Sequence, residues 1–523
     1  MDRVKINIDG RDIETVKGKT VIQAAADEGI FIPHYCYHPK LSIAGNCRMC
    51  LVEIEKMPKL QIACNTLASD GMVVRTASPK VIEARRAVME FLLINHPLDC
   101  PICDQAGECW LQDYYMKHDL SPSRFVENKE RAPKRQIFGP HVVFDAERCI
   151  KCTRCVRFLQ EVTRTEELTV LERGDRATIA LFPGTALDNP LSANVNDICP
   201  VGALTDRDFR FRVRVWYLSS TPSVCPGCST GCNIKIETYQ NRIARFKPRV
   251  NEEVNSHWIC DEGRYCFHAL TEVERLTAPL VRQEGGLVPT DWETALKAVL
   301  SGLSAAAPLA GLISGRATNE EAYLFSRLLK RLSSDAALQV FYRERELSET
   351  AKILMSPDRS PNLRGARDAG CADTDMDSWL ERLKRGDFGA VFIVGEDLLS
   401  QASDASEIAA ALKRLRFLVV QDTTLSASAS IAHVVLPAMN FAEKDGTYTN
   451  RKGRVQRLRP ALVPPAGALP DWEIFARLFA LAGAPIPYAN PGDVFAALSA
   501  EIPAYRGLSY ERIGELGVQL EER

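Results

Sequence analysis

Residues 149–155 read CIKCTRC, and residues 196–204 read NDICPVGAL. The first stretch supplies three cysteines at C-x2-C-x2-C spacing, and the second supplies a fourth cysteine followed directly by proline. Tight C-x2-C spacing lets one loop wrap a metal corner, and in two-cluster bacterial ferredoxins a Cys-Pro cysteine ligates the cluster begun by the other motif. The two stretches therefore predict one ferredoxin-type iron–sulfur site formed by Cys149, Cys152, Cys155 and Cys199.

Three further sets of the same size lie on either side of this one. Fifteen of the seventeen cysteines fall in the four sets, all within the first half of the chain. Four thiolates, or three thiolates and an imidazole, fill the protein-facing positions of a two-iron or four-iron cluster. We expect the two remaining cysteines, Cys266 and Cys371, to be small buried hydrophobes rather than ligands. The other predicted ligand sets are Cys36, Cys47, Cys50 and Cys64; His96, Cys100, Cys103 and Cys109; and Cys225, Cys228, Cys232 and Cys260.

Two alternative interpretations concern the ligands. C-x2-C pairs also form tetrahedral zinc sites, but Cys-Pro within CPVGAL and the long loop between Cys36 and Cys47 are not zinc-finger patterns. His96 could merely cap a loop before Pro97, yet its frame, H-x3-C-x2-C-x5-C, favours ligation. We therefore favour iron–sulfur clusters in all four sets.

Basic residues also lie between the ligands, at Arg48, Lys151 and Arg154. They could tune a cluster potential through hydrogen bonds around the ligands. A solvated surface position explains the same residues equally well, so the sequence leaves both interpretations open.

The length and charge of the chain limit the number of domains and the kinds of partner to be expected. A chain of 523 residues exceeds the size of one growing core, so we expect three to five domains. The formal charge of −2 comes with no basic stripe, which argues against nucleic acid. The amino terminus begins as an alternating strand, and the uncharged run 298–315 contains Pro308, so we expect neither a secretory signal nor a membrane span. In a reducing cytosol, dense cysteines favour metal cofactors over disulfides.

The first 95 residues have the order of a plant-type ferredoxin domain. Strand-like runs at Val4–Ile8 and Asp12–Val16 precede a helix from Thr20 to Gly29 and a cysteine-bearing loop. The C-x10-C spacing exceeds the plant-type C-x4-C, so this loop must be longer. A second helix is predicted at Pro79–Ile94, with proline at its first position.

The later segments change in character. Residues 96–140 show little periodicity and are expected to fold around their cluster, and strand-like runs at 213–218 (VRVWYL) and 240–249 flank the fourth set. After residue 271 strands alternate with helices, which indicates an α/β domain with a largely parallel sheet. The predicted fold class is α+β multidomain, with N-terminal ferredoxin-like Fe–S domains followed by that α/β domain. The predicted domains are 1–95, 96–140, 141–215, 216–270 and 271–523.

With the four sets in this order, the chain closely resembles the large iron–sulfur subunit of bacterial respiratory NADH:quinone oxidoreductase, the complex I family. The resemblance implies one [2Fe–2S] cluster on the Cys36 set and three [4Fe–4S] clusters on the others, the second with His96 as a ligand. It implies an electron relay, in which a flavin-carrying partner subunit oxidises NADH and electrons enter at the Cys36 set. They would continue through the Cys149 and His96 sets towards quinone, with the Cys225 set off this line.

The same resemblance implies partners and a location. The flavin subunit and other peripheral-arm subunits would be direct partners, and the membrane arm an indirect one, on the cytoplasmic side of the inner membrane. The chain has no G-x-G-x-x-G motif, so it is not expected to bind NADH itself.

The second half resembles a shortened, degenerate molybdopterin-oxidoreductase domain of the formate dehydrogenase type. The blocks that carry the resemblance are 314–331, 362–370 and 434–456. Segment 340–352 lacks the metal-ligating cysteine of active relatives, and Glu262 stands where they usually have lysine. The blocks also lie too close together for a full set of pterin-binding domains. The resemblance therefore implies a non-catalytic scaffold without molybdopterin.

Two other classes of function are weighed against the relay. The chain could be the iron–sulfur subunit of a formate dehydrogenase or of an NAD-linked hydrogenase complex. The missing catalytic cysteine disfavours the first, and no hydrogen-activating cysteine block follows the clusters as the second requires. A purely structural assembly subunit would need redox-silent clusters.

Overall fold

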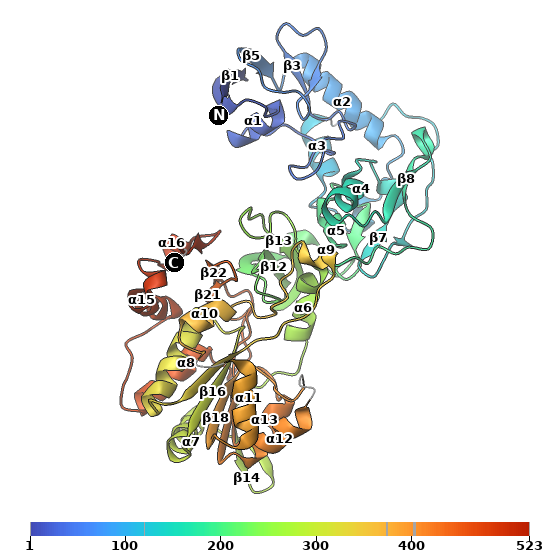
Figure 1. Ribbon diagram of the computed structural model, residues 1–523. Helices are drawn as coiled ribbons and strands as arrows, with labels where there is room; N and C mark the ends of the chain where they lie inside the picture. Colours follow the sequence, from blue (N-terminus) through green and yellow to red (C-terminus); the bar gives the residue numbers. More distant parts are fainter. Residues whose placement is uncertain (1, 120, 373–374, 401–403, 522–523) are drawn as a thin grey trace. The chain divides into compact units, whose positions relative to one another are not determined.

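The computed structural model describes residues 2–119, 121–372, 375–400 and 404–521. The chain folds into two compact units, Met1–Leu218 and Ser219–Arg523, and Figure 1 shows the elements of each. The finer division into five domains stays a prediction.

None of the helices within these residues combines the length and apolar character needed to span a bilayer.

The first unit opens with a five-stranded sheet in the order β2-β1-β5-β3-β4. Val4, Ile6 and Ile8 alternate with exposed residues along β1 and bury one face of the sheet. Thr20 caps the first helix in a capping box with Gln23, so the two predicted strands and the helix after them are confirmed. The elements are β1 (Arg3–Ile8), β2 (Arg11–Val16), α1 (Val21–Asp27), β3 (Leu51–Ile54), β4 (Gln61–Ile62) and β5 (Met72–Arg75).

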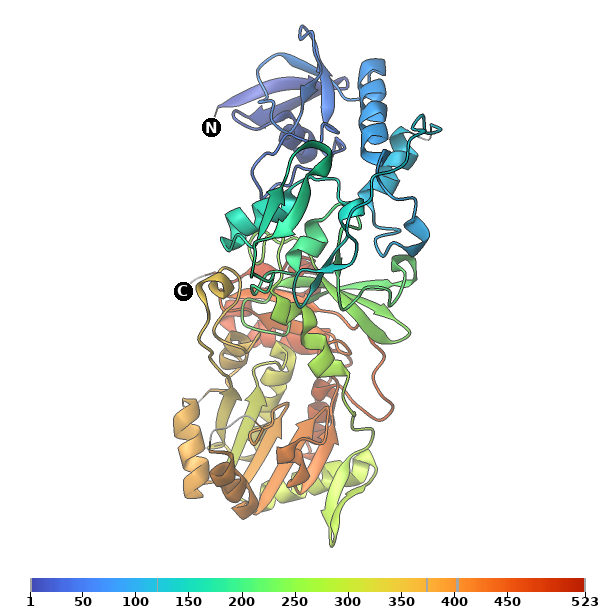
Figure 2. The ribbon, with the colours of Figure 1, turned by 90° about the vertical axis from the view of Figure 1, so that its right-hand side faces the viewer.

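The predicted helix at 79–94 is α2 (Pro79–Leu93), with Ser78 as its N-cap. It stands beside the sheet in Figures 1 and 2. The weakly periodic segment after it contains a helix that the sequence did not predict, α3 (Trp110–His118). The remaining elements of this unit are short: η1 (Cys100–Ile102), β6 (Gln136–Ile137), β7 (Val142–Phe144), η2 (Ala146–Arg148), α4 (Arg154–Phe158), η3 (Leu159–Thr163), β8 (Leu168–Leu171), η4 (Gly174–Arg176), β9 (Thr178–Leu181), α5 (Asn194–Ile198), β10 (Leu204–Asp206) and η5 (Val215–Tyr217).

The strand predicted at 213–218 is wrong. The segment forms the 3₁₀ turn η5, and the next strand begins only at Ser219. Arg214 donates to the carbonyl oxygens of Cys103, at 2.6 Å, and Pro101. These long-range bonds hold the segment against the second ligand set instead of in a sheet, which a local alternation of residues cannot reveal.

The second unit begins with a three-stranded antiparallel sheet followed by one helix. The sheet order is β11-β12-β13, and the last strand confirms the one predicted within 240–249. The elements are β11 (Ser219–Val224), β12 (Asn233–Tyr239), β13 (Arg242–Pro248) and α6 (Asp261–Thr271).

A seven-stranded sheet forms the centre of the second unit, in the order β15-β14-β20-β19-β18-β16-β17. The last five strands in this order pair in parallel, and the two at the other edge are antiparallel. The predicted largely parallel sheet is therefore confirmed. The strands are β14 (Leu280–Gln283), β15 (Gly286–Pro289), β16 (Leu309–Ser314), β17 (Ala337–Phe341), β18 (Ala390–Val394), β19 (Phe417–Asp422) and β20 (Val434–Pro437).

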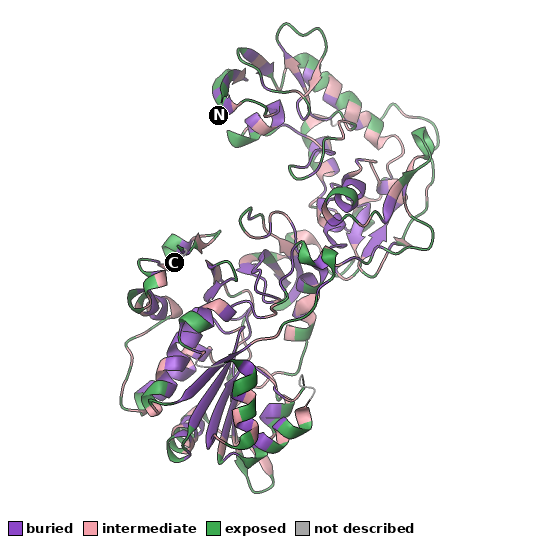
Figure 3. Ribbon diagram, in the orientation of Figure 1, coloured by how far each residue is buried: buried purple, intermediate pink, exposed green. Residues whose placement is uncertain are grey.

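Helices cover both faces of this sheet, and its strands β16 and β18 are buried throughout (Figure 3). Helices α7, α8 and α14 pack on one face, with α15 against α8, and α11, α12 and α13 pack on the other. The helices are α7 (Trp292–Ala305), α8 (Asn319–Leu332), α9 (Glu349–Lys352), α10 (Leu363–Asp368), α11 (Met376–Arg385), α12 (Ala405–Arg414), α13 (Ala427–Ser430), α14 (Asp471–Leu481), α15 (Pro491–Glu501), η6 (Pro503–Tyr505) and α16 (Tyr510–Ile513). A small sheet adds β21 (Gly446–Thr449), β22 (Arg454–Leu458) and β23 (Val518–Gln519).

A buried ion pair network joins three parts of the second unit. The Lys444 ammonium lies 2.8 Å from a Glu321 carboxylate oxygen and 2.9 Å from one of Asp471. Glu321 also completes the capping box with Thr318 at the start of α8. All three charged side chains are buried.

Substitution Lys444→Met should destabilise the second unit by about 3–5 kcal/mol, because it leaves two carboxylates buried without their cation. Hydrogen exchange of the β16 and β18 amides measures the loss. Lys297→Met is the matched control, since Lys297 pairs with Glu293 on the exposed face of α7 and should change exchange negligibly. Equal hydrogen-exchange rates in the two variants would contradict a stabilising role for the buried Lys444 ion pairs.

Candidate iron–sulfur centres

The first ligand set lies around β3 and β4. Cys36 and Cys47 end a long loop, Cys50 directly precedes β3 and Cys64 follows β4. The thiols meet as two hydrogen-bonded pairs, Cys36 with Cys47 and Cys50 with Cys64. The bond from Cys47 lowers the pKa of Cys36 to about 5. Cys64 also feels the charges of Cys36 and Cys47, so the structure brings the four predicted ligands together.

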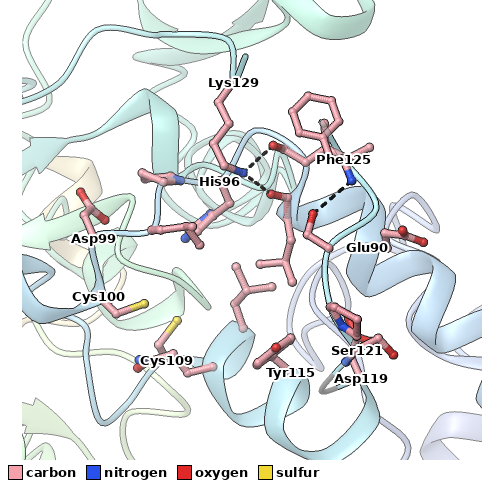
Figure 4. Close-up of a pocket in the computed structure, with 18 of the residues that line it drawn as sticks. Glu90, His96, Asp99, Cys100, Cys109, Tyr115, Asp119, Ser121, Phe125 and Lys129 are labelled. Atoms are coloured by element: carbon pink, nitrogen blue, oxygen red, sulfur yellow. Dashed lines mark hydrogen bonds between the residues drawn. The ribbon is translucent and has the colours of Figure 1, made fainter. Parts of the chain in front are cut away.

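The second set lines a cavity of about 970 Å³. Figure 4 shows His96, Cys100 and Cys109 around it, with the two labelled sulfur atoms pointing towards one another. Burial lowers the pKa of His96 to about 4, which keeps the imidazole neutral near pH 7 and its lone pair available to iron. A Cβ on Gly202 would stand 2.4 Å from the Cys103 Sγ, so the backbone of the CPVGAL motif reaches this cavity.

A basic strap, defined as residues 124–134, holds the chain that carries His96. Arg124 Nε donates to Glu90 of α2 at 2.7 Å. The Lys129 ammonium donates to the last carbonyls of the same helix, Leu93 O at 2.8 Å and Ile94 O at 2.6 Å (Figure 4). This arrangement satisfies helix-end carbonyls immediately before His96. Sequence reasoning missed it, because nothing in the strap marks its partners.

The third set lines one small cavity. Cys149, Cys152, Cys155 and Cys199 all face it, together with apolar side chains from β7, β9 and β10. Burial raises the pKa of Cys149 and of Cys199 to about 12 each. A thiolate here needs compensating positive charge, which iron supplies, so the donor set fits a cluster.

The fourth set lies in the second unit. Cys225, Cys228 and Cys232 occupy the turn between β11 and β12, and Cys260 is the N-cap of α6. A Cβ on Gly263 would lie 3.1 Å from the sulfur atoms of both Cys225 and Cys260. This close approach brings the two ends of the predicted set to one place.

Over the part of the chain that the structure describes, no three Cys, His, Asp or Glu side chains gather as tightly as one metal ion requires. An iron–sulfur cluster places several irons and sulfides between its ligands, so its thiolates stand farther apart than those around one zinc ion.

The two cysteines outside the sets differ from each other. Cys371 is fully buried and donates to Ala322 O, as expected of a small buried residue. Cys266 is partly exposed, which corrects the prediction for it. Its thiol donates to Gly263 O at 3.2 Å and lies in hydrogen-bond contact with Cys225, because α6 places it one turn after that glycine.

The three basic residues between ligands have separate surroundings. Arg48 is exposed, which matches the surface interpretation. The Lys151 amide donates to the Cys149 sulfur at 3.4 Å while its ammonium bonds to Asp175 O. Arg154 is buried and its guanidinium donates to the Ile198 carbonyl at 3.1 Å. Two of the three therefore contact the neighbourhood of a ligand.

Five protein-family models match the chain in the order of these sites. They are the 2Fe-2S iron-sulfur cluster binding domain over residues 1–79, the NADH-ubiquinone oxidoreductase-G iron-sulfur binding region over 85–124, the NADH-quinone oxidoreductase subunit 3 ferredoxin-like domain over 139–205, the NADH-ubiquinone oxidoreductase NDSU1/NuoG-like 4Fe-4S domain over 219–268 and the molybdopterin oxidoreductase over 275–376 and 362–481.

Individual relatives agree with these family matches. A NADH-quinone oxidoreductase subunit of Rickettsia felis is 43% identical over 334 residues, which cover 64% of this chain and 50% of the relative. The match thus spans about half the length of that relative. The mitochondrial NADH-ubiquinone oxidoreductase 78 kDa subunit of Neurospora crassa is 33% identical over 645 residues, covering 99% of this chain and 87% of that subunit.

A solved structure, the NAD+-reducing [NiFe]-hydrogenase in the H2-reduced state, matches 40% of this chain and 91% of its own at 31% identity, with a TM-score of 0.37. On the extent of the sequence matches, the chain belongs to the family of the large iron–sulfur subunit of NADH-quinone oxidoreductase. It accordingly carries domains of the 2Fe–2S and 4Fe–4S binding types.

Substitution His96→Cys should lower the midpoint potential of one centre and leave the others unchanged. A thiolate adds a negative charge next to the iron, which disfavours the reduced state, just as histidine ligands raise the potential of Rieske centres. An EPR-monitored redox titration measures all the midpoints at once, so the other centres are internal controls. His96→Ala should instead lose that signal. Unchanged midpoints in assembled His96→Cys protein would remove His96 from the ligand set.

Proposed function

We propose that the chain is an electron-relay subunit of a respiratory NADH:quinone oxidoreductase. Its direct partners are a flavin-bearing, NADH-oxidising subunit and other subunits of the peripheral arm, on the cytoplasmic side of the membrane. The Cys36 set holds one [2Fe–2S] cluster, and the His96, Cys149 and Cys225 sets each hold a [4Fe–4S] cluster. Each cluster, when bound, accepts and releases one electron at a time.

The observation that carries this proposal is the interlocking of neighbouring ligand loops in the first unit. Asp99, just before Cys100, pairs with Arg148, just before Cys149, at 2.6 Å. The Trp110 amide, just after Cys109, donates to Pro200 O at 3.0 Å. Electron transfer slows steeply with distance, so a relay requires this kind of fixed proximity between centres.

The residues around the sites supply the rest of the environment. Cys36, Cys50 and Cys64 are almost fully buried, as are all four cysteines of the fourth set. Such burial excludes water from a centre and keeps its ligands rigid. The apolar shell also influences the potential at which each centre accepts its electron.

The second half of the chain acts in this proposal as a scaffold without molybdopterin. Glu262, which stands where active relatives usually have lysine, forms ion pairs with Arg345 and Arg359. Arg345 belongs to the segment that lacks the catalytic cysteine. The ion pairs give a structural role to Glu262 and to the segment without the catalytic cysteine, the two differences from active relatives. They therefore disfavour a formate dehydrogenase. The match to a respiratory relative over nearly the whole chain disfavours the hydrogenase alternative.

Anaerobically purified protein should contain about 14 iron atoms per chain, from one two-iron and three four-iron clusters. Inductively coupled plasma analysis together with an acid-labile sulfide assay measures this content, and molybdenum and tungsten should be absent from the same samples. A few zinc atoms with no sulfide would contradict the cofactor assignment, and stoichiometric molybdenum would contradict the scaffold assignment.

Substitution Cys232→Ser should remove one EPR signal yet preserve much of the NADH-to-quinone electron flow, because its set belongs to the scaffold unit. Activity is normalised to intact complex, since a lost cluster can weaken assembly. Cys266→Ser is the matched control, because Cys266 touches this site without being a proposed ligand, and the signal should persist. Complete loss of turnover in an assembled Cys232→Ser complex would place this centre on the main path.

A further inference from the structure

Two arginines of α4 connect the first ligand set with the third. Arg157 Nη2 donates to the carbonyl oxygen of Cys36 at 2.6 Å and to that of Cys152 at 3.2 Å. One nitrogen atom therefore joins the backbones of two proposed ligands that belong to different centres. Its other terminal nitrogen, Nη1, donates to Ser42 O.

Arg154 lies at the junction of three sets. Its guanidinium donates to Ile198 O at 3.1 Å and to Tyr37 O, the residues next to Cys199 and Cys36. The same guanidinium lies 4.6 Å from the ring centre of Trp110, the residue after Cys109. Each contact is thus one residue away from a proposed ligand.

The long loop between Cys36 and Cys47 provides most of the partners on the first set's side. Tyr37 and Ser42 accept hydrogen bonds from the two arginines. The side-chain amide of Asn46, in the same loop, donates to Lys151 O at 3.1 Å. The Ser42 amide donates to Glu161 at 2.7 Å. The additional length relative to a plant-type C-x4-C loop therefore docks the first set onto the third.

The charges of the two arginines are not balanced by acidic side chains. Both guanidinium groups are buried, with Arg154 only 3% exposed. Among the residues that the structure describes, every hydrogen bond of the two groups goes to a carbonyl or a hydroxyl oxygen, and Arg154 Nε has no acceptor. A buried cation without a counter-ion is strongly unfavourable. The acidic groups that face Arg154 are first the thiols of Cys152, Cys199 and Cys36, which belong to the two centres, and then the Tyr114 phenol.

We propose that Arg154 and Arg157 form a cationic bridge that fixes the spacing of the first and third centres and raises the potentials of both. This inference rests on the proposed function, because the compensating negative charge is that of thiolate-ligated clusters. An additional electron makes either centre more negative, so a nearby cation favours the reduced state. In the transfer, the electron that one centre loses is gained by the other. Neither arginine changes its charge or its bonding.

The test compares charge removal with charge retention in the cluster-loaded chain. Arg157→Met removes the cation and keeps a side chain of similar length. The equilibrium constant for reduction of each of the two centres should then fall about tenfold, which lowers each midpoint potential by ~59 mV for a one-electron couple. Arg157→Lys keeps the charge, but an ammonium lacks the planar fork that reaches several carbonyls. Its midpoints should therefore stay near the original values, while hydrogen exchange of residues 37–46 rises and transfer between the two centres slows about tenfold. Redox titration and rapid freeze-quench EPR give these readouts.

Arg173→Gln, at an exposed position of the same unit, is the control and should change none of these quantities. Unaltered midpoints in Arg157→Met, or unaltered exchange and transfer in Arg157→Lys, with both EPR signals present, would overturn the bridge and leave the relay function standing. If Arg157→Met does not assemble, Arg157→Lys alone decides by its exchange and transfer rates. Absence of both signals from the unsubstituted protein would overturn the function and the bridge together.

Discussion

Burial of several thiolates in one place is the constraint on which the first unit depends. Each thiol that loses its proton away from water needs nearby positive charge, and the four-ligand sets gather in loops that have little regular structure of their own. The third set shows this most directly, because burial, and after it the charge of the neighbouring thiols, raises the pKa of Cys149 and of Cys199 to about 12. We therefore expect metal binding and folding to be linked in this unit, as in other small metal-binding domains.

The second unit is built on different physics. Its seven-stranded sheet buries apolar side chains on both faces, and that core is independent of any cofactor. Its most deeply buried ion pairs lie inside the protein, where Lys444 is held between the carboxylates of Glu321 and Asp471. The loop of the fourth set is tied to this framework, since Thr230 Oγ1 donates to Leu354 O and Gln456 Nε2 donates to Gly231 O. The fourth predicted ligand set thus lies in a loop that the folded framework of the second unit holds in place.

Local chemistry was predictable from the sequence, and long-range partners were not. The short cysteine spacings and the strand–helix alternation depend on neighbours within a few positions, so they could be predicted. The strand at 213–218 failed because Arg214 binds carbonyls more than a hundred positions earlier. Arg154 was left undecided for the same reason, since its acceptors lie at Tyr37 and Ile198. Helix α3 was missed because the segment from which it forms lacks a clear apolar period.

The position of Gly202 limits how this chain can be divided into transferable segments. Its backbone belongs to the Cys-Pro motif of the third set, yet the position of its missing side chain is occupied by the sulfur of Cys103 from the second. The two motifs are therefore not interchangeable modules. A ferredoxin segment transplanted into or out of this chain would have to carry residues 96–204 as one piece. The boundary between sequence-family matches near residue 139 is therefore not a domain boundary in the folded molecule.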